Sequence, residues 1–85
     1  MPYYVYIILC TDGSFYTGYT KNLDVRARLH ACGKGARYTK MHKPSGVAYA
    51  ELLDSRAQAM KREKAIKKLT HQQKVNLINS RKTNG

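Results

Sequence analysis

The first twenty residues follow the pattern of a β-hairpin, and no other feature of the chain constrains its fold as much. Residues 3–9 are almost all aromatic or branched apolar residues, as in a buried strand. Asp12-Gly13 is a turn signal, and the strand pattern resumes over residues 15–19. The chain therefore opens with two antiparallel strands.

The length of the hairpin loop decides which side chains share a face, because side chains alternate along a strand. A two-residue loop pairs Leu9 with Tyr16 and puts Tyr6 and Tyr16 on opposite faces. A loop with an odd number of residues, such as three ending in a bulge, pairs Cys10 with Tyr16 and puts both tyrosines on one face with Gly18. It also gathers the apolar side chains on the other face, namely Val5, Ile7, Leu9 and Phe15. We predict the odd loop because it separates the two sets better.

A helix is expected after the hairpin. Asn22 is a good N-cap for a helix that runs to about Ala31, and the glycines at 33 and 35 end it. Helical periodicity predicts an inward arc that holds three apolar and two polar side chains: Leu23, Val25, Leu29, Arg26 and His30.

Residues 33–46 are typical of a basic loop, and residues 47–53 of a third strand. Two further helices are predicted by capping-box pairs, Ser55 with Gln58 and Thr70 with Gln73. The fold class is therefore α+β, with a small three-stranded antiparallel sheet flanked by about three helices. A chain of 85 residues buries one modest core, so we expect a single domain over residues 1–80 and a flexible tail over 81–85.

The charge of the chain favours a polyanionic partner. Sixteen Lys and Arg residues against five Asp and Glu give a formal net charge of +11, spread from Lys21 to Lys82. A solvated basic face, or a ribosome-associated domain, is the alternative. Cys10 and Cys32 are too few and too far apart for a zinc cluster or a disulfide framework.

Membrane association is not expected. No apolar run approaches the ~20 residues of a spanning helix, and the start, Met1-Pro2-Tyr3-Tyr4, lacks the basic region of a signal peptide. We expect a cytoplasmic monomer.

Three short motifs and three single polar residues follow one another along the chain: Tyr4-Val5-Tyr6, Tyr16-Thr17-Gly18, Lys21-Asn22-Leu23, Arg26, His30 and Glu63. This order and spacing, over residues 3–78, resemble the GIY-YIG endonuclease domain. Tyr4 stands where that family usually has glycine, and Thr17 replaces an isoleucine. The run from Gly33 to Thr39 is similar to the small free-standing members, some of which are described as single-strand-specific DNA nucleases.

The resemblance implies a metal-dependent nuclease in which a hairpin carries the two tyrosines and a later helix supplies one metal-binding glutamate. Glu63 lies on the predicted core-facing stripe of its helix, between Ala59, Met60 and Ile66. A buried carboxylate needs a cation partner. The partner is either a salt bridge to Arg26 or to a lysine, or a metal ion.

The acidic residues limit the metal chemistry. Of the five, no pair is spaced like a two-metal carboxylate cluster, and only Glu63 is expected to point inward. We expect one divalent cation on Glu63, Mg²⁺ or Mn²⁺, with water and substrate phosphate oxygens completing its shell.

Phosphodiester hydrolysis then assigns the other predicted catalytic residues. Arg26 stabilises charge on the phosphoryl oxygens. Tyr6 is the first candidate for general base, Tyr16 orients the water or the phosphate, and His30 is a competing base or proton relay. The sequence does not choose among Tyr6, Tyr16 and His30.

Basic residues interleaved with an aromatic side chain suit a single strand, through phosphate contacts and base stacking. The predicted nucleic-acid-binding residues are Lys21, Lys34, Arg37, Tyr38, Lys40 and Lys43, with DNA favoured over RNA. The lysines around Glu63, at 61, 64, 67 and 68, can extend this track or serve solubility. The alternative function is a noncatalytic nucleic-acid-binding module on the same fold, or a nuclease that needs a protein partner.

Overall fold

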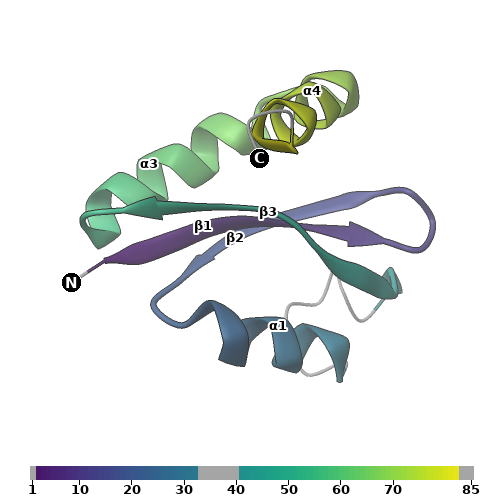
Figure 1. Cartoon of the computed structure of the whole chain (residues 1–85), viewed down its shortest axis with the longest axis horizontal. Coiled ribbons are helices and arrows are strands. Elements are labelled where there is room, and N and C mark those ends of the chain that lie inside the picture. The colour runs from purple at the N-terminus through teal and green to yellow at the C-terminus, as the bar shows by residue number, and fades with distance from the viewer. Residues whose placement is uncertain (1, 33–40, 83–85) are drawn as a thin grey trace.

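A three-stranded antiparallel sheet forms the middle layer of the protein, with strand order β2-β1-β3. The computed structural model describes residues 2–32 and 41–82. Helix α1 covers one face of the sheet, and α3 and α4 cover the other (Figure 1). The elements are β1 (Tyr3–Cys10), β2 (Phe15–Thr20), α1 (Leu23–Ala31), β3 (Pro44–Leu53), α3 (Arg56–Lys67) and α4 (His71–Lys82). The predicted α+β architecture is confirmed.

The hairpin loop has an odd number of residues, as predicted, but the register differs from the prediction. The backbone N–H of Cys10 donates to Ser14 O at 2.9 Å, so the loop consists of residues 11–13. Tyr16 lies opposite Ile8, and Tyr6 opposite Gly18. The predicted pairing of Cys10 with Tyr16 is wrong because the turn closes at Gly13, whose φ of 86° suits glycine. The shift is two residues, so both tyrosines keep the same face.

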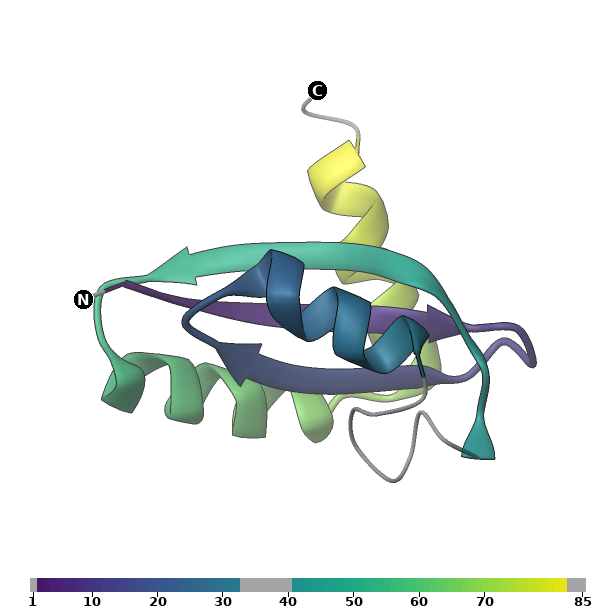
Figure 2. The ribbon, with the colours of Figure 1, turned by 90° about the horizontal axis from the view of Figure 1, so that it is seen from below.

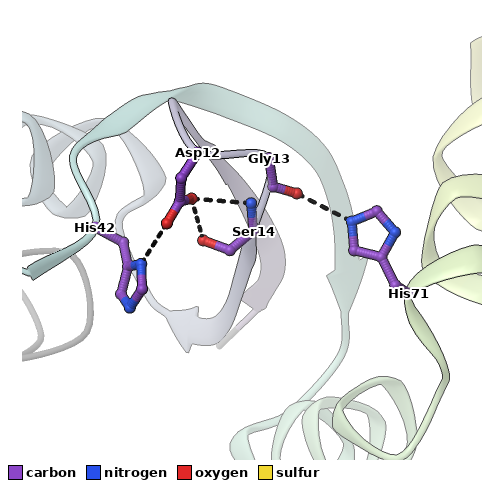
Figure 3. A network of polar contacts seen from close by, with 5 residues as sticks. All are labelled: Asp12, Gly13, Ser14, His42 and His71. Atoms are coloured by element: carbon purple, nitrogen blue, oxygen red, sulfur yellow. Dashed lines mark hydrogen bonds and ion pairs between the residues drawn. The ribbon is translucent and has the colours of Figure 1, made fainter.

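The tip of the hairpin is fastened on two sides (Figure 3). Asp12 accepts hydrogen bonds from the N–H and hydroxyl of Ser14 at 3.0 and 2.6 Å, and its other oxygen lies 2.5 Å from His42 Nδ1. These bonds hold the pKa of the Asp12 carboxyl well below its usual range, with the Ser14 hydroxyl contributing most. On the other side, His71 Nε2 lies 2.9 Å from Gly13 O. The tip thus joins the segment before β3 to the start of α4.

Strand β3 begins three residues earlier than predicted, at Pro44 rather than Val47. The added residues pair with the end of β1, where Gly46 lies opposite Leu9 and Pro44 opposite Cys10. A proline is tolerated there because β3 is an edge strand, whose outward N–H needs no partner in the sheet.

The two faces of the sheet carry separate apolar clusters, as the odd loop predicts. The cluster under α3 and α4 is built from Val5, Ile7, Tyr49, Ala59, Ile66 and Ile78. The cluster under α1 is built from Tyr6, Ile8 and Cys10, with Tyr16 and Leu23 packed against it. Leu9 is 36% exposed, so it contributes less to the first cluster than expected.

The predicted helix starts are confirmed by their caps. Asn22 Oδ1 accepts from the N–H of Val25 at 3.1 Å, and Ser55 Oγ accepts from the N–H of Gln58 at 3.2 Å. Thr70 and Gln73 form a reciprocal capping box at 3.1 and 2.9 Å. No helix in the described parts of the chain is long and apolar enough to span a membrane.

The inward side of α1 differs from the predicted arc. Val25 is 47% exposed, whereas Ala27 and His30 line a small cavity with Ile8 of β1. At 3.6 residues per turn, Leu23, Ala27 and His30 form one row that excludes Val25. The small side chain of Ala27 allows this row to approach the sheet.

Candidate active site

Two cross-strand tyrosines and a glycine form the floor of the site. The Tyr6 and Tyr16 ring centroids are 6.3 Å apart, with the rings tilted by 45°. Gly18 lies opposite Tyr6 on the neighbouring strand. A Cβ at Gly18 would lie 2.6 Å from Tyr6 Oη and 3.1 Å from Tyr16 Cε2. The rings can therefore lie across the strand only because this residue has no side chain.

Helix α1 adds His30 to the two rings. Its Nε2 lies 3.0 Å from Tyr6 Oη, in hydrogen-bonding distance. The His30 ring centroid is 5.8 Å from that of Tyr6 and 5.2 Å from that of Tyr16. His30 is 1% exposed and is the buried residue of α1. The structure thus brings three of the five predicted catalytic residues into one cluster.

Burial and neighbouring charges set the protonation of this cluster. Burial raises the pKa of Tyr6 far above 10, with further upward contributions from Tyr16 and Glu63 that Arg26 opposes. Burial, followed by the charge of Glu63, also raises the pKa of Tyr16. Burial and then the Arg26 charge lower the pKa of His30 below 6.5. Tyr6, Tyr16 and His30 are all neutral at pH 7.

Arg26 and Glu63 act on the cluster as charges of opposite sign. Arg26 is exposed, so the prediction that it faces the sheet is wrong. A guanidinium at the edge of the inward row of α1 keeps its hydration by turning to solvent. Its charge nevertheless reaches Tyr6, Tyr16 and His30.

Glu63 of α3 is mostly buried, with its side chain 17% exposed. The helix buries Ala59 and Ile66 as predicted, whereas Met60 lies at the margin and is 36% exposed. Lys67 Nζ lies 3.7 Å from Glu63 Oε1, from a side chain that is half exposed. The lysine predicted as one possible partner of Glu63 is therefore present, at a long distance.

The surroundings of Glu63 fit a hard cation that is bound by one carboxylate and by water, rather than a cation that is enclosed by several protein ligands. Within residues 2–32 and 41–82 no three His, Cys, Asp or Glu side chains gather into a metal-binding group. Mg²⁺ commonly takes one or two carboxylates and keeps several waters. The carboxylate of Glu63 is compatible with such an ion, and in the described part of the chain it does not belong to a group of three His, Cys, Asp or Glu side chains.

Residues 2–76 match the GIY-YIG catalytic domain. The chain belongs to the GIY-YIG family. It is similar to UPF0213 proteins of Staphylococcus haemolyticus and Staphylococcus aureus strain Mu3, with 47% and 44% identity over 79 residues that cover 93% of this chain and 96% of each relative. The resemblance drawn from the tyrosine triplets is thus confirmed.

Two solution NMR structures share the fold. The UPF0213 protein from Bacillus halodurans has 42% identity and a TM-score of 0.59, covering 93% of this chain and 84% of its own. A protein from E. faecalis has 38% identity and a TM-score of 0.64, covering 94% and 85%. The GIY-YIG catalytic domain is a nuclease fold, and this chain carries it over nearly its whole length.

The two departures from the GIY-YIG triplets leave the paired tyrosines in place. Tyr4 is half-buried and faces the same side of the sheet as Tyr6, because side chains alternate along a strand. It lies two residues further than Tyr6 from the hairpin loop. Thr17 points to the other face, opposite Ile7. It is 3% exposed, and its Oγ1 has no hydrogen-bond partner among the described residues. An isoleucine at that position would leave no such polar atom.

The predicted nucleic-acid-binding residues of this GIY-YIG domain are only partly described. Lys21 is exposed, with Nζ 5.9 Å from the Tyr3 ring centroid. Lys43 is exposed just before β3, and its carbonyl accepts from Thr11 N–H at 2.8 Å. The other four lie outside the described residues: Lys34, Arg37, Tyr38 and Lys40.

One polar network on the α3 side of this GIY-YIG sheet was not predicted from the sequence. Tyr49 donates a hydrogen bond to Glu51, and Arg62 donates from Nε to both carboxylate oxygens of Glu51. Strand alternation puts Tyr49 and Glu51 on one face, which is the local signal that was available. Nothing in the sequence marks Arg62 as their partner.

Proposed function

We propose that this protein is a metal-dependent endonuclease that hydrolyses phosphodiester bonds of DNA, with a preference for single-stranded or branched substrates. The observation that carries the proposal is the 3.0 Å contact between Tyr6 Oη and His30 Nε2. Both groups are neutral at pH 7. A neutral imidazole bonded to a buried phenol is equipped to accept a proton through it.

The proton path follows from these pKa shifts. Burial disfavours the ionised phenolate of Tyr6, so Tyr6 is not deprotonated before the reaction begins. In the proposed step, water loses a proton to Tyr6 Oη while the phenol proton passes to His30 Nε2. The water oxygen bonds to phosphorus as the bond from phosphorus to the leaving oxygen breaks. The leaving oxygen keeps that electron pair and takes a proton from solvent, and His30 returns its extra proton to solvent. Tyr16, which contacts both rings, orients the attacking water or the phosphate.

Arg26 and Glu63 have complementary roles in this proposal. The exposed guanidinium of Arg26 binds the non-bridging phosphoryl oxygens as they gain charge. Glu63 would hold the divalent cation, Mg²⁺ or Mn²⁺. When bound, such an ion neutralises charge on the phosphate and on the leaving oxygen. Arg26 and Glu63 thus supply charge, while Tyr6 and His30 move the proton.

The substrate class rests on charge and on a basic side chain beside an aromatic ring. The net charge of +11 favours a nucleic acid. Lys21 Nζ lies 5.9 Å from the Tyr3 ring centroid, and a cation beside an aromatic ring suits a single strand through phosphate contacts and base stacking, so we favour substrates with accessible single strands. The second candidate function, a noncatalytic nucleic-acid-binding module, is favoured by the departure of the first triplet from the family pattern at Tyr4. Against it stands the presence of Arg26 and Glu63 together, because a protein that only binds nucleic acid has no need of an inward carboxylate beside the phosphate that it must attract.

The test incubates the protein with labelled single-stranded and duplex DNA and RNA, in Mg²⁺ or in EDTA. Wild type should cut DNA only with Mg²⁺, and Glu63→Ala should abolish cutting while changing binding by no more than a few-fold. Asp54→Ala, which removes an exposed carboxylate, is the matched control and should cut normally. Equal loss of binding in Glu63→Ala would contradict its role. Salt-sensitive binding with no cutting of any substrate would favour the binding module.

A further inference from the structure

Glu51 connects the edge strand β3 to helix α3 through a three-residue network. Arg62 Nε lies 3.0 Å from Glu51 Oε1 and 3.3 Å from Oε2, and Tyr49 donates its hydroxyl hydrogen to Oε2. Tyr49 is 6% exposed and belongs to the core under α3 and α4. The Glu51 carboxylate is therefore oriented by a buried phenol and paired with a cation from the helix.

The position of Arg62 on α3 links this network to Glu63. The helix buries Ala59 and Ile66, both at 0% exposure, and these two residues define the seam that packs on the sheet. At about 100° per residue, Arg62 and Glu63 lie roughly 50° to either side of that seam. Any rotation of α3 about its axis moves both side chains together.

The ion pair adds a directional contact between α3 and β3 to the packing of the two buried residues. Figure 2 shows α3 running beside β2, with β3 at the opposite edge of the sheet. Arg62 reaches toward β3, and Glu63 takes the other side of the seam. From there the Glu63 charge raises the pKa of both Tyr6 and Tyr16. If α3 turned, Glu63 would leave that position.

We propose that Glu51 and Arg62 are positioning residues whose ion pair, oriented by Tyr49, sets the rotation of α3 and thereby presents Glu63 to a divalent cation beside the two tyrosines. This inference rests on the proposed function, because it assigns a supporting layer to the same metal site. Residues that orient a metal ligand typically change metal affinity by about 10–100-fold when they are replaced.

The test measures Mn²⁺ binding without substrate, by paramagnetic broadening of backbone amide NMR signals near Glu63, together with cleavage as a function of Mg²⁺ concentration. Glu51→Gln should weaken Mn²⁺ binding by about tenfold or more and shift cleavage to higher Mg²⁺, with the rate largely recovered at saturating Mg²⁺. A merely destabilised protein would instead lose rate at every Mg²⁺ concentration. Arg62→Lys, which keeps a cation, should retain more affinity than Arg62→Ala.

Asp12→Asn is the matched control, because it removes the carboxylate that pairs with His42 at the hairpin tip, away from α3 (Figure 1). It should leave Mn²⁺ binding unchanged. Wild-type Mn²⁺ affinity in both Glu51→Gln and Arg62→Ala would overturn the inference while leaving the nuclease proposal standing. Failure of the wild-type protein both to bind Mn²⁺ and to cut DNA would instead overturn the proposed function, and the inference with it.

Discussion

Replacing Gly18 with alanine puts a methyl group where the Tyr6 ring lies. The new Cβ would fall 2.6 Å from Tyr6 Oη, 2.9 Å from Tyr6 Cζ and 3.1 Å from Tyr16 Cε2. Tyr6 is 3% exposed and bonded to His30, so its ring has no free space to enter. Either β2 moves away from β1, or the ring swings out and the bond to His30 breaks.

The cost follows from these two routes. Overpacking a core costs about 1–3 kcal/mol, and a lost hydrogen bond costs about 0.5–1.5 kcal/mol. Alanine offsets part of this, because it loses less backbone entropy than glycine by roughly 0.5–1 kcal/mol. We therefore expect Gly18→Ala to lower the free energy of unfolding by about 2 kcal/mol, or the Tm by roughly 10 °C for a domain of this size.

Gly46→Ala is the matched control, since a Cβ on that strand glycine meets nothing within 4 Å. It should leave stability unchanged or raise it by up to about 1 kcal/mol. Urea unfolding of both variants gives the free energies, and the ring nitrogen signals of His30 report whether its bond to Tyr6 persists. Equal stability of the two variants, with that bond intact in Gly18→Ala, would show that the site accepts a methyl group at Gly18, contrary to the clash predicted here.

Three further predictions concern the cluster and the core. Burial and the Arg26 charge lower the pKa of His30 below 6.5, so the unfolded state binds a proton at this residue before the folded state does. Both the cleavage rate and the folding stability should therefore fall only as the pH drops below 6.5. An unaltered acid limb in the pH–rate profile of His30→Gln would contradict this. Ile7→Ala should cost about 2–5 kcal/mol in urea unfolding, whereas Leu52→Ala, at a side chain 59% exposed, should stay within about 0.5 kcal/mol; similar losses would contradict the burial pattern. Asn22→Ala should cost about 1 kcal/mol and speed amide hydrogen exchange at the start of α1; unchanged exchange would contradict the cap.

The placement of the two tyrosines on one face could be predicted from the sequence, but their register could not. Pairing Cys10 with Tyr16, or with Ser14 as observed, puts the same side chains on the same faces. The hydrophobic pattern therefore fixes only whether the loop is odd or even. The choice between the two registers depends on where the turn closes, and that depends on the positive φ of Gly13.

The prediction of which side chains of α1 face inward was wrong for a related reason. Periodicity rewards large apolar side chains, so the pattern favoured Val25, which is exposed in the structure. The row that packs is centred on Ala27, a residue too small to dominate a hydrophobic pattern. His30 lies on both arcs, which explains why its burial was predicted correctly.

For the charged residues of α3, the sequence predicted the burial of Glu63 but not the ion pair of Arg62. Glu63 was expected to face inward because Ala59 and Ile66 flank it, and the helix does bury those residues. The ion pair between Glu51 and Arg62 joins strand β3 to helix α3. Such a pair depends on tertiary packing and has no signature in either segment alone.

A double-mutant cycle on Tyr6 and His30 tests whether the phenol and the imidazole act as one proton relay. Cleavage rates of single-stranded DNA at saturating Mg²⁺ would be compared for wild type, Tyr6→Phe, His30→Gln and the double variant, each checked for folding by urea unfolding. If the phenol and the imidazole pass one proton between them, the double variant should lose little more rate than the worse single variant, because residues that act as a unit are not additive. Fully additive losses, or wild-type rates in either single variant, would contradict the proposed relay.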